Sequence, residues 1–208
     1  MKSDIIVKYL DELFPDPKCE LIYFNDYSLL MAIVLSAPCT DKRVNSVTPL
    51  IFDRYKSLVE LKNADLGELE SIIRPVGSFR KKASYIKNIA TLLVDKYDGV
   101  VPRDRKILES FPGVGRKTVN VFLGELYNEP AIAVDTHVER VSKRLRLAYL
   151  NDDVYKVEQK LMKKFPKDKW ARLHLQMVLF GRYYCKAVKP ECCNCKLKDM
   201  CRNKNKNF

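Results

Sequence analysis

The chain has 208 residues, and its 38 lysine and arginine residues outnumber 26 acidic ones, which gives a formal net charge of +12 at pH 7. This length suits one good-sized domain or two small ones that share a core. The charge favours a polyanionic partner such as nucleic acid, although a solvated lysine-rich surface would give the same excess. The amino terminus lacks a signal-peptide core and no apolar run reaches the length of a membrane span, so we expect a soluble, cytoplasmic protein without membrane association.

Apolar residues recur at helical spacing along almost the whole chain, and sustained two-residue alternation is absent. We therefore expect an all-α protein of about ten helices. The clearest apolar stripes lie at residues 6–13, 30–37, 86–93, 138–145 and 154–161. Asp41 is a candidate cap for a further helix that carries Val44, Val47 and Ile51. The one β-like stretch, Ala131 to Val134, is short enough to be a connector.

A very short turn, Gly113-Val114-Gly115, joins two helical patterns between residues 104 and 126. Glycine permits positive φ and lets another backbone approach closely. The amides of the turn and the start of the next helix form a natural seat for a phosphate. With Arg116 and Lys117 directly after it, the turn is typical of a DNA-binding helix-hairpin-helix. An ordinary interhelical turn with a surface lysine is the alternative.

Lys117 lies roughly 200° around its helix from the apolar Val119, so we expect its side chain to point away from the core. A lysine acts as a nucleophile only when its amine is neutral part of the time. The first turn of a helix and the adjacent Arg116 both favour the neutral form. Lysine also forms Schiff bases with aldehyde carbons, which arginine does not. Lys117 is therefore a candidate nucleophile.

Four of the seven cysteines lie close together near the end of the chain, at Cys185, Cys192, Cys195 and Cys201. In a reducing compartment such cysteines are more typical of metal ligands or buried thiols than of disulfides. Their spacing is too tight for a ββα zinc finger. It favours one compact four-thiolate centre, either Zn²⁺ or an iron–sulfur cluster.

Three segments, FPGVGRKTVNVFL, IAVDTHVERV and GRYYCKAVKPECCNCKLKDMC, resemble signature segments of endonuclease III, a bacterial bifunctional DNA glycosylase/AP lyase, and LSAPCTDKRVN resembles a fourth. They occur in the order of the family and near its spacing, over essentially the whole chain. The resemblance implies an all-α fold of two helical domains that flank a DNA-binding cleft. One is a six-helix domain at residues 22–132 with the helix-hairpin-helix. The other is a discontinuous four-helix iron–sulfur domain at residues 1–21 plus 133–208.

The resemblance also implies roles for individual residues. Lys117 corresponds to the nucleophilic lysine, and Asp135 in VDTH corresponds to the catalytic carboxylate. Asp135 could instead cap the helix that begins near Thr136, and both roles can hold at once. The four clustered cysteines correspond to [4Fe–4S] ligands, with Cys193 as an extra thiol and zinc as the physical alternative. DNA contacts are implied at Pro38, Asp41, Ser78, Gly113, Val114, Gly115, Arg116, Lys186 and Lys189, the last two of which could equally be solvated lysines.

The family removes oxidised or otherwise damaged pyrimidines from duplex DNA by lysine attack on the sugar and then nicks the abasic site by β-elimination. We therefore expect a monomeric, nucleoid-associated base-excision repair enzyme that binds double-stranded DNA with damaged pyrimidines or abasic sites. Two alternatives stay open. An adenine-mismatch glycosylase generally lacks lysine at position 117 and carries an additional C-terminal domain. A non-catalytic iron–sulfur DNA-binding protein would have no need of Lys117 and Asp135.

The chain departs from the family at two positions. Pro38 stands where a glutamine commonly enters the space left by the flipped nucleotide, and Ser78 stands where a bulky apolar wedge is usual. Proline has no side-chain donor, and serine is too short to unstack bases as a wedge does. We therefore expect efficient nicking of existing abasic sites, comparatively slow removal of well-stacked damaged bases, and weak discrimination of the base opposite the lesion.

Overall fold

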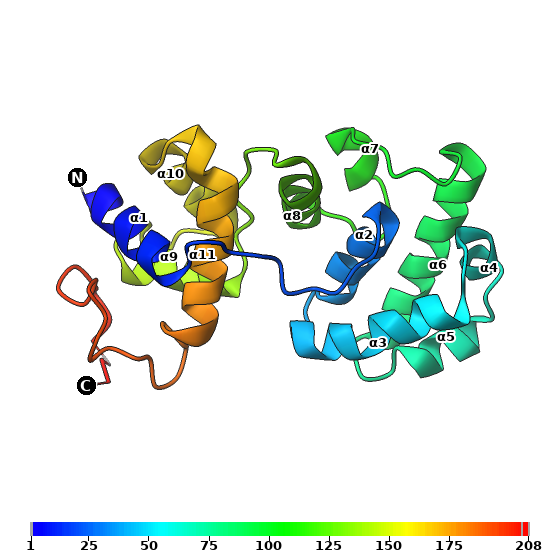
Figure 1. The fold of residues 1–208 in the computed structure, drawn as a ribbon, viewed down its shortest axis with the longest axis horizontal. Helices are drawn as coiled ribbons and strands as arrows, with labels where there is room; N and C mark the ends of the chain where they lie inside the picture. Colours follow the sequence, from blue (N-terminus) through cyan, green and yellow to red (C-terminus); the bar gives the residue numbers. More distant parts are fainter. Residues whose placement is uncertain (1, 205, 208) are drawn as a thin grey trace. The chain divides into compact units, whose positions relative to one another are not determined.

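The computed structural model describes residues 2–204 and 206–207. These residues form eleven α-helices, one short 3₁₀ helix and no β-strand, so the all-α prediction is confirmed (Figure 1). The chain divides into two compact units, one of Met1–Cys19 with Tyr127–Phe208 and the other of Glu20–Leu126. The domain limits given above, 22–132 and 1–21 plus 133–208, stay a prediction. Among the described helices, none combines the length and the apolar character that crossing a bilayer requires.

Seven α-helices lie in the Glu20–Leu126 unit, the last of which extends one residue beyond it, whereas the family resemblance implies six in its predicted domain at 22–132. They are α2 (Asp26–Leu35), α3 (Asp41–Arg54), α4 (Leu58–Lys62), α5 (Leu66–Ile72), α6 (Phe79–Lys96), α7 (Arg105–Glu109) and α8 (Arg116–Tyr127). Two of them, α4 and α7, have only five residues, too few to show a periodic stripe. N-cap residues mark the starts of these two helices, since the Ser57 and Asp104 side chains accept hydrogen bonds from first-turn amides.

Helix α6 is the central support of this unit. Its expected stripe, Ile86, Ile89, Ala90 and Leu93, is fully buried, and the helix packs against α2, α4 and α5 (Figure 1). Helix α2 is buried all round from Ser28 to Leu35, and a capping box between Asn25 and Ser28 fixes its start. It ends at Leu35, two residues earlier than the apolar pattern indicates, because the chain turns there and leaves Ala37 exposed.

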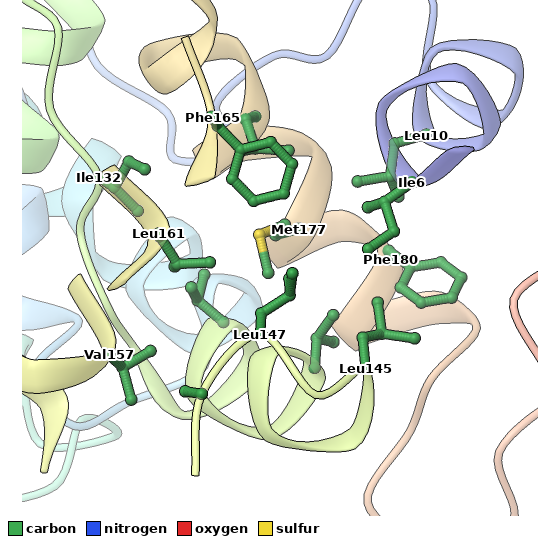
Figure 2. Packing of buried hydrophobic residues seen from close by; sticks show 14 of the residues in the cluster. Ile6, Leu10, Ile132, Leu145, Leu147, Val157, Leu161, Phe165, Met177 and Phe180 are labelled. Carbon is green, nitrogen blue, oxygen red and sulfur yellow. The ribbon is translucent and has the colours of Figure 1, made fainter. Parts of the chain in front are cut away.

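The other unit joins α1 (Lys2–Leu13) to α9 (Thr136–Arg144), α10 (Val154–Lys164) and α11 (Trp170–Tyr183). Helix α1 packs on α11, and α9 packs on both α10 and α11. Figure 2 shows Ile6 and Leu10 of α1 beside Phe180 of α11 in the core of this unit. Each such side chain contributes about 1.5–3 kcal/mol when fully buried. The connector Ala131–Val134 is buried and forms no strand, as expected.

A polar contact adds to this apolar packing between α1 and α11. Asp11 Oδ1 accepts hydrogen bonds from Arg172 Nε at 2.9 Å and from Gln176 Nε2 at 2.8 Å. Burial by itself raises the pKa of the Asp11 carboxyl, but the hydrogen bonds from Gln176 and Arg172 outweigh it, and the pKa lies below its ordinary value. The ionised carboxylate therefore stabilises the α1–α11 contact.

Candidate DNA interface, catalytic residues and cysteine centre

The hairpin turn between α7 and α8 has the geometry that its sequence predicts. Gly113 adopts a φ of 76°, and a Cβ built on it would lie 2.4 Å from the Tyr85 ring, so only glycine fits. Gly115 differs, because a Cβ there would meet nothing within 4 Å. Gly113 and Gly115 are exposed, whereas Val114 is buried and its amide donates to the carbonyl of Phe111 at 3.1 Å. Of the turn residues predicted to contact DNA, Val114 therefore has a buried side chain that is not available for such a contact.

Arg116 and Lys117 open α8, and both are exposed. The opposite face of the helix buries Val119, Phe122 and Leu123. The predicted orientation of Lys117, away from the apolar stripe, is thus observed. Lys117 is therefore an accessible amine directly beside the hairpin turn.

Asp135 is the N-cap of α9, as the alternative interpretation predicts. Its Oδ1 accepts hydrogen bonds from the amides of His137 at 2.9 Å and Val138 at 2.8 Å. The residue is half-buried, and both bonds go to the same carboxylate oxygen. These amides hold the side chain in one rotamer, so the cap also orients the carboxylate for chemistry.

Two arginines link α9 to α11 and to the cysteine-bearing segment, a connection the sequence does not reveal. Arg140 donates to the carbonyls of Gly181 at 2.6 Å and Cys185 at 3.1 Å. Arg144 donates to the Cys185 Sγ at 3.3 Å and to the Lys186 carbonyl at 2.6 Å. The glycine inside α11 allows the approach, since a Cβ on Gly181 would lie 2.8 Å from the Cβ of His137. A lone glycine in an otherwise helical pattern is the available sequence signal.

The four predicted ligands line one small pocket: Cys185, Cys192, Cys195 and Cys201. Leu145, Phe180 and Tyr184 give its walls apolar and aromatic surface, and charged residues, among them Arg144 and Lys198, also line it. Burial raises the pKa of the Cys185 thiol, and the adjacent Arg144 guanidinium opposes that shift. A shared pocket with apolar walls and a cationic donor to sulfur fits a four-thiolate centre. In residues 2–204 and 206–207, no three cysteine, histidine or acidic side chains are gathered as ligands of a single ion.

The loop between the first two cysteines carries the two predicted phosphate contacts. Lys186 is half-buried and forms an ion pair with Glu191 at 2.6 Å. Lys189 is exposed and holds a left-handed backbone, with a φ of 49°. An ion pair this close to water contributes little stability, so Lys186 can exchange Glu191 for a phosphate at small cost.

Two further predicted contacts, Pro38 and Ser78, belong to neighbouring exposed loops of the Glu20–Leu126 unit. A Cβ on Gly77 would lie 3.8 Å from the Pro38 carbonyl oxygen, so the loops lie side by side. Ser78 precedes α6 in a left-handed conformation, φ 57°, and forms no capping hydrogen bond. Asp41 is the first residue of α3 rather than its cap. The N-cap position belongs to Thr40.

Comparison with known proteins gives a consistent result. Residues 31–167 match the HhH-GPD superfamily of base excision DNA repair proteins. Endonuclease III of Bacillus subtilis (strain 168) is 45% identical over 197 residues, which cover 95% of this chain and 90% of the relative. Endonuclease III of Escherichia coli (strain K12) is 37% identical over 201 residues, which cover 97% and 95%. A solved trapped endonuclease III–DNA covalent intermediate, in an estranged-adenine complex, matches with TM-score 0.92 and 48% identity over 97% of this chain and 96% of that one.

Proposed function

The chain belongs to the HhH-GPD superfamily and, within it, to the endonuclease III family of DNA glycosylase/AP lyases, and we propose that it removes damaged pyrimidines from duplex DNA through Lys117 and Asp135. The observation that carries the proposal is the exposed amine of Lys117 in the first turn of α8, directly after the hairpin turn. We further propose that the protein works as a monomer on the DNA of the nucleoid, in the cytoplasm.

The proposed chemistry begins at the sugar carbon that bears the damaged base. Lys117 Nζ attacks this C1′ atom, and the glycosidic bond breaks as the base takes its electron pair and a proton. The amine loses a proton, the sugar ring opens, and C1′ and Nζ form a Schiff base. Removal of a C2′ proton then expels the 3′ phosphate by β-elimination, and water releases the amine. Every electron pair is accounted for, so no oxidant or reductant is consumed.

Asp135 supplies the negative charge that these reaction steps need. As a carboxylate it stabilises the positive charge that develops on the sugar while the base departs. Its two cap hydrogen bonds to Oδ1 hold it in place before substrate arrives, which lowers the cost of reorganisation in the transition state.

We propose that the cysteine pocket holds a [4Fe–4S] cluster on Cys185, Cys192, Cys195 and Cys201. When bound, such a cluster cross-links the segment that carries its four ligands. Arg144 holds the first of these ligands through its sulfur and the neighbouring carbonyls. The segment in turn carries Lys186 and Lys189, which we assign to DNA phosphates. Further phosphate and groove contacts are assigned to Arg116, the hairpin turn amides, Pro38, Asp41 and Ser78.

Borohydride trapping tests the proposal directly, because only a Schiff base to DNA is reduced to a stable adduct. We expect the wild-type protein to trap on an abasic-site duplex and Lys117→Gln not to trap. Lys106→Gln is the matched control, since Lys106 is an exposed lysine on α7 of the same hairpin. Undiminished trapping by Lys117→Gln would assign the nucleophile to another amine. Release of thymine glycol but not of adenine from an A·G mismatch would support the pyrimidine specificity, and the reverse pattern would contradict it.

A further inference from the structure

A buried lysine on α6 makes a contact that the proposed chemistry does not use. Lys82 is 3% exposed, and its Nζ donates a 2.8 Å hydrogen bond to the carbonyl oxygen of Leu35, the last residue of α2. The last carbonyls of a helix have no intrahelical partner and carry the negative end of the helix dipole. The ammonium group therefore caps the C-terminus of α2 and holds it against α6.

This contact connects α2 and α6, the two helices that carry the exposed loops of Pro38 and Ser78. Helix α2 ends three residues before Pro38, and α6 begins directly after Ser78, about one turn before Lys82. The loops also touch at Gly77 and the Pro38 carbonyl. A change in the Lys82 contact would therefore alter the spacing of Pro38 and Ser78.

The burial of a cation at this point is not explained by stability. Burial lowers the pKa of Lys82 below its ordinary value, while the nearby Cys39 sulfur opposes that shift, so folding works against the charged form. A methionine of similar length would fill the same space without this cost. The hydrogen bond to Leu35 offsets part of the cost and is specific in position, which apolar packing is not.

We propose that Lys82 is a positioning residue that holds the loops at 36–40 and 76–78 at a fixed spacing, so that both enter the DNA together when a nucleotide is extruded. The inference rests on the proposed function, since it takes the insertion of Pro38 and Ser78 into DNA as given. Because neither side chain is a long wedge, their joint placement determines how well the duplex is held open. Nicking of an existing abasic site needs no base extruded and depends on this spacing much less.

The chain offers a matched control on the same helix. Lys87 Nζ donates a 2.7 Å hydrogen bond to the carbonyl of Ala64, in the turn between α4 and α5. Lys87→Met therefore removes a contact of the same kind, a lysine on α6 bound to a backbone carbonyl. Neither Lys87 nor Ala64 belongs to a segment predicted to contact DNA.

The experiment compares wild type, Lys82→Met and Lys87→Met under single-turnover conditions. One duplex contains thymine glycol beside 2-aminopurine, whose fluorescence reports base extrusion, and a second contains a preformed abasic site. We expect Lys82→Met to slow base removal about tenfold, less than the roughly 100-fold that a 1 Å misplacement can cost. The 2-aminopurine signal should fall with it, and nicking of the abasic duplex should stay within about twofold of wild type. Lys87→Met should leave all three quantities unchanged.

A double-mutant cycle adds a readout that a change in overall stability would not move. If Lys82 acts through the Pro38 loop, Lys82→Met and Pro38→Gly together slow base removal less than the product of their separate effects. Should Lys82→Met not fold, the shorter and uncharged Lys82→Gln takes its place, with the same expected split between base removal and nicking.

The outcomes separate the inference from the proposed function. Equal slowing of both steps by Lys82→Met, equal effects of Lys82→Met and Lys87→Met, or multiplicative effects in the cycle would overturn the inference and leave the proposed function intact. A wild-type protein that neither releases thymine glycol nor nicks the abasic duplex would refute the proposed function and the inference with it.

Discussion

Replacement of Gly113 by alanine tests the geometry of the hairpin turn. The new Cβ would stand 2.4 Å, 2.8 Å and 3.0 Å from three carbons of the Tyr85 ring. Carbon atoms pack best at about 3.5–4.0 Å, so the ring has to move by roughly 1 Å. Overpacking of this kind costs about 1–3 kcal/mol. The left-handed backbone, φ 76°, adds about 1–2 kcal/mol for a residue with a Cβ.

The two costs together amount to about 3 kcal/mol, which lowers the melting temperature by roughly 6–12 °C for a chain of this size. Differential scanning calorimetry measures this shift, and a fluorescence titration with an abasic-analogue duplex measures the accompanying decrease in affinity. Gly115→Ala is the matched control, because its Cβ meets nothing within 4 Å and its φ is not positive. We expect it to change stability by less than about 1 kcal/mol.

Tyr85→Ala separates the two contributions. In that background Gly113→Ala should cost only the backbone share, about 1–2 kcal/mol, because the ring is gone. If Gly113→Ala and Gly115→Ala destabilised the protein equally, or if the cost of Gly113→Ala were the same with and without Tyr85, the steric argument would be refuted.

Three further predictions concern other parts of the molecule. Asp135→Asn should leave thermal stability nearly unchanged, because asparagine caps a helix as well as aspartate does, whereas Asp135→Ala should destabilise the protein by about 1 kcal/mol. Both variants should slow base removal in single-turnover assays, and an Asp135→Asn protein with wild-type activity would contradict the carboxylate role. Lys186→Ala with Lys189→Ala should weaken binding to all DNA sequences alike. Fluorescence anisotropy at several salt concentrations should show the slope of log binding constant against log salt concentration reduced by about 0.9 for each phosphate that is no longer neutralised, and an unchanged slope would remove both lysines from the DNA interface. The lowered pKa of Asp11 implies a stabilising contribution that is present above the ordinary value of 3.8 and disappears as the pH falls through the lower pKa of the folded state. Asp11→Asn should therefore make the free energy of unfolding less dependent on pH in the acid range, and the same pH dependence in both proteins would show that the carboxylate does not contribute.

Features that depend on local spacing could be predicted from the sequence. The stripe of α6 and the orientation of Lys117 follow from helical periodicity, and the need for glycine at 113 follows from the short turn. The cap at Asp135 is one of the two roles that the sequence predicts, and it is observed. The stripe, the lysine orientation and the cap depend on residues within two turns of one another, whereas the contact of Gly113 with Tyr85, which adds to the need for glycine, comes from the fold.

Contacts between distant segments could not be predicted in the same way. Lys82 looks like one more lysine in a basic run, and only the fold brings it to Leu35, 47 residues away. Arg140 and Arg144 show no sequence signal for their partners in the cysteine segment, because apart from the Cys185 sulfur those partners are backbone carbonyls, which every residue carries. The predicted cap of α3 is wrong by one residue, since Thr40 and Asp41 are both acceptable caps.

The discontinuity of the unit built from α1 and α9–α11 sets an order of events during synthesis. Helix α1 leaves the ribosome first, but its main partner begins at Trp170, and residues 14–169 lie between them. At synthesis rates of about 5–20 residues per second, these residues take roughly 8–30 s to emerge. Throughout that interval Ile6 and Leu10 lack α11, the helix on which α1 packs, while the whole Glu20–Leu126 segment becomes available to fold. The nascent chain therefore acquires the helix-hairpin-helix before it acquires the surroundings of its cysteines.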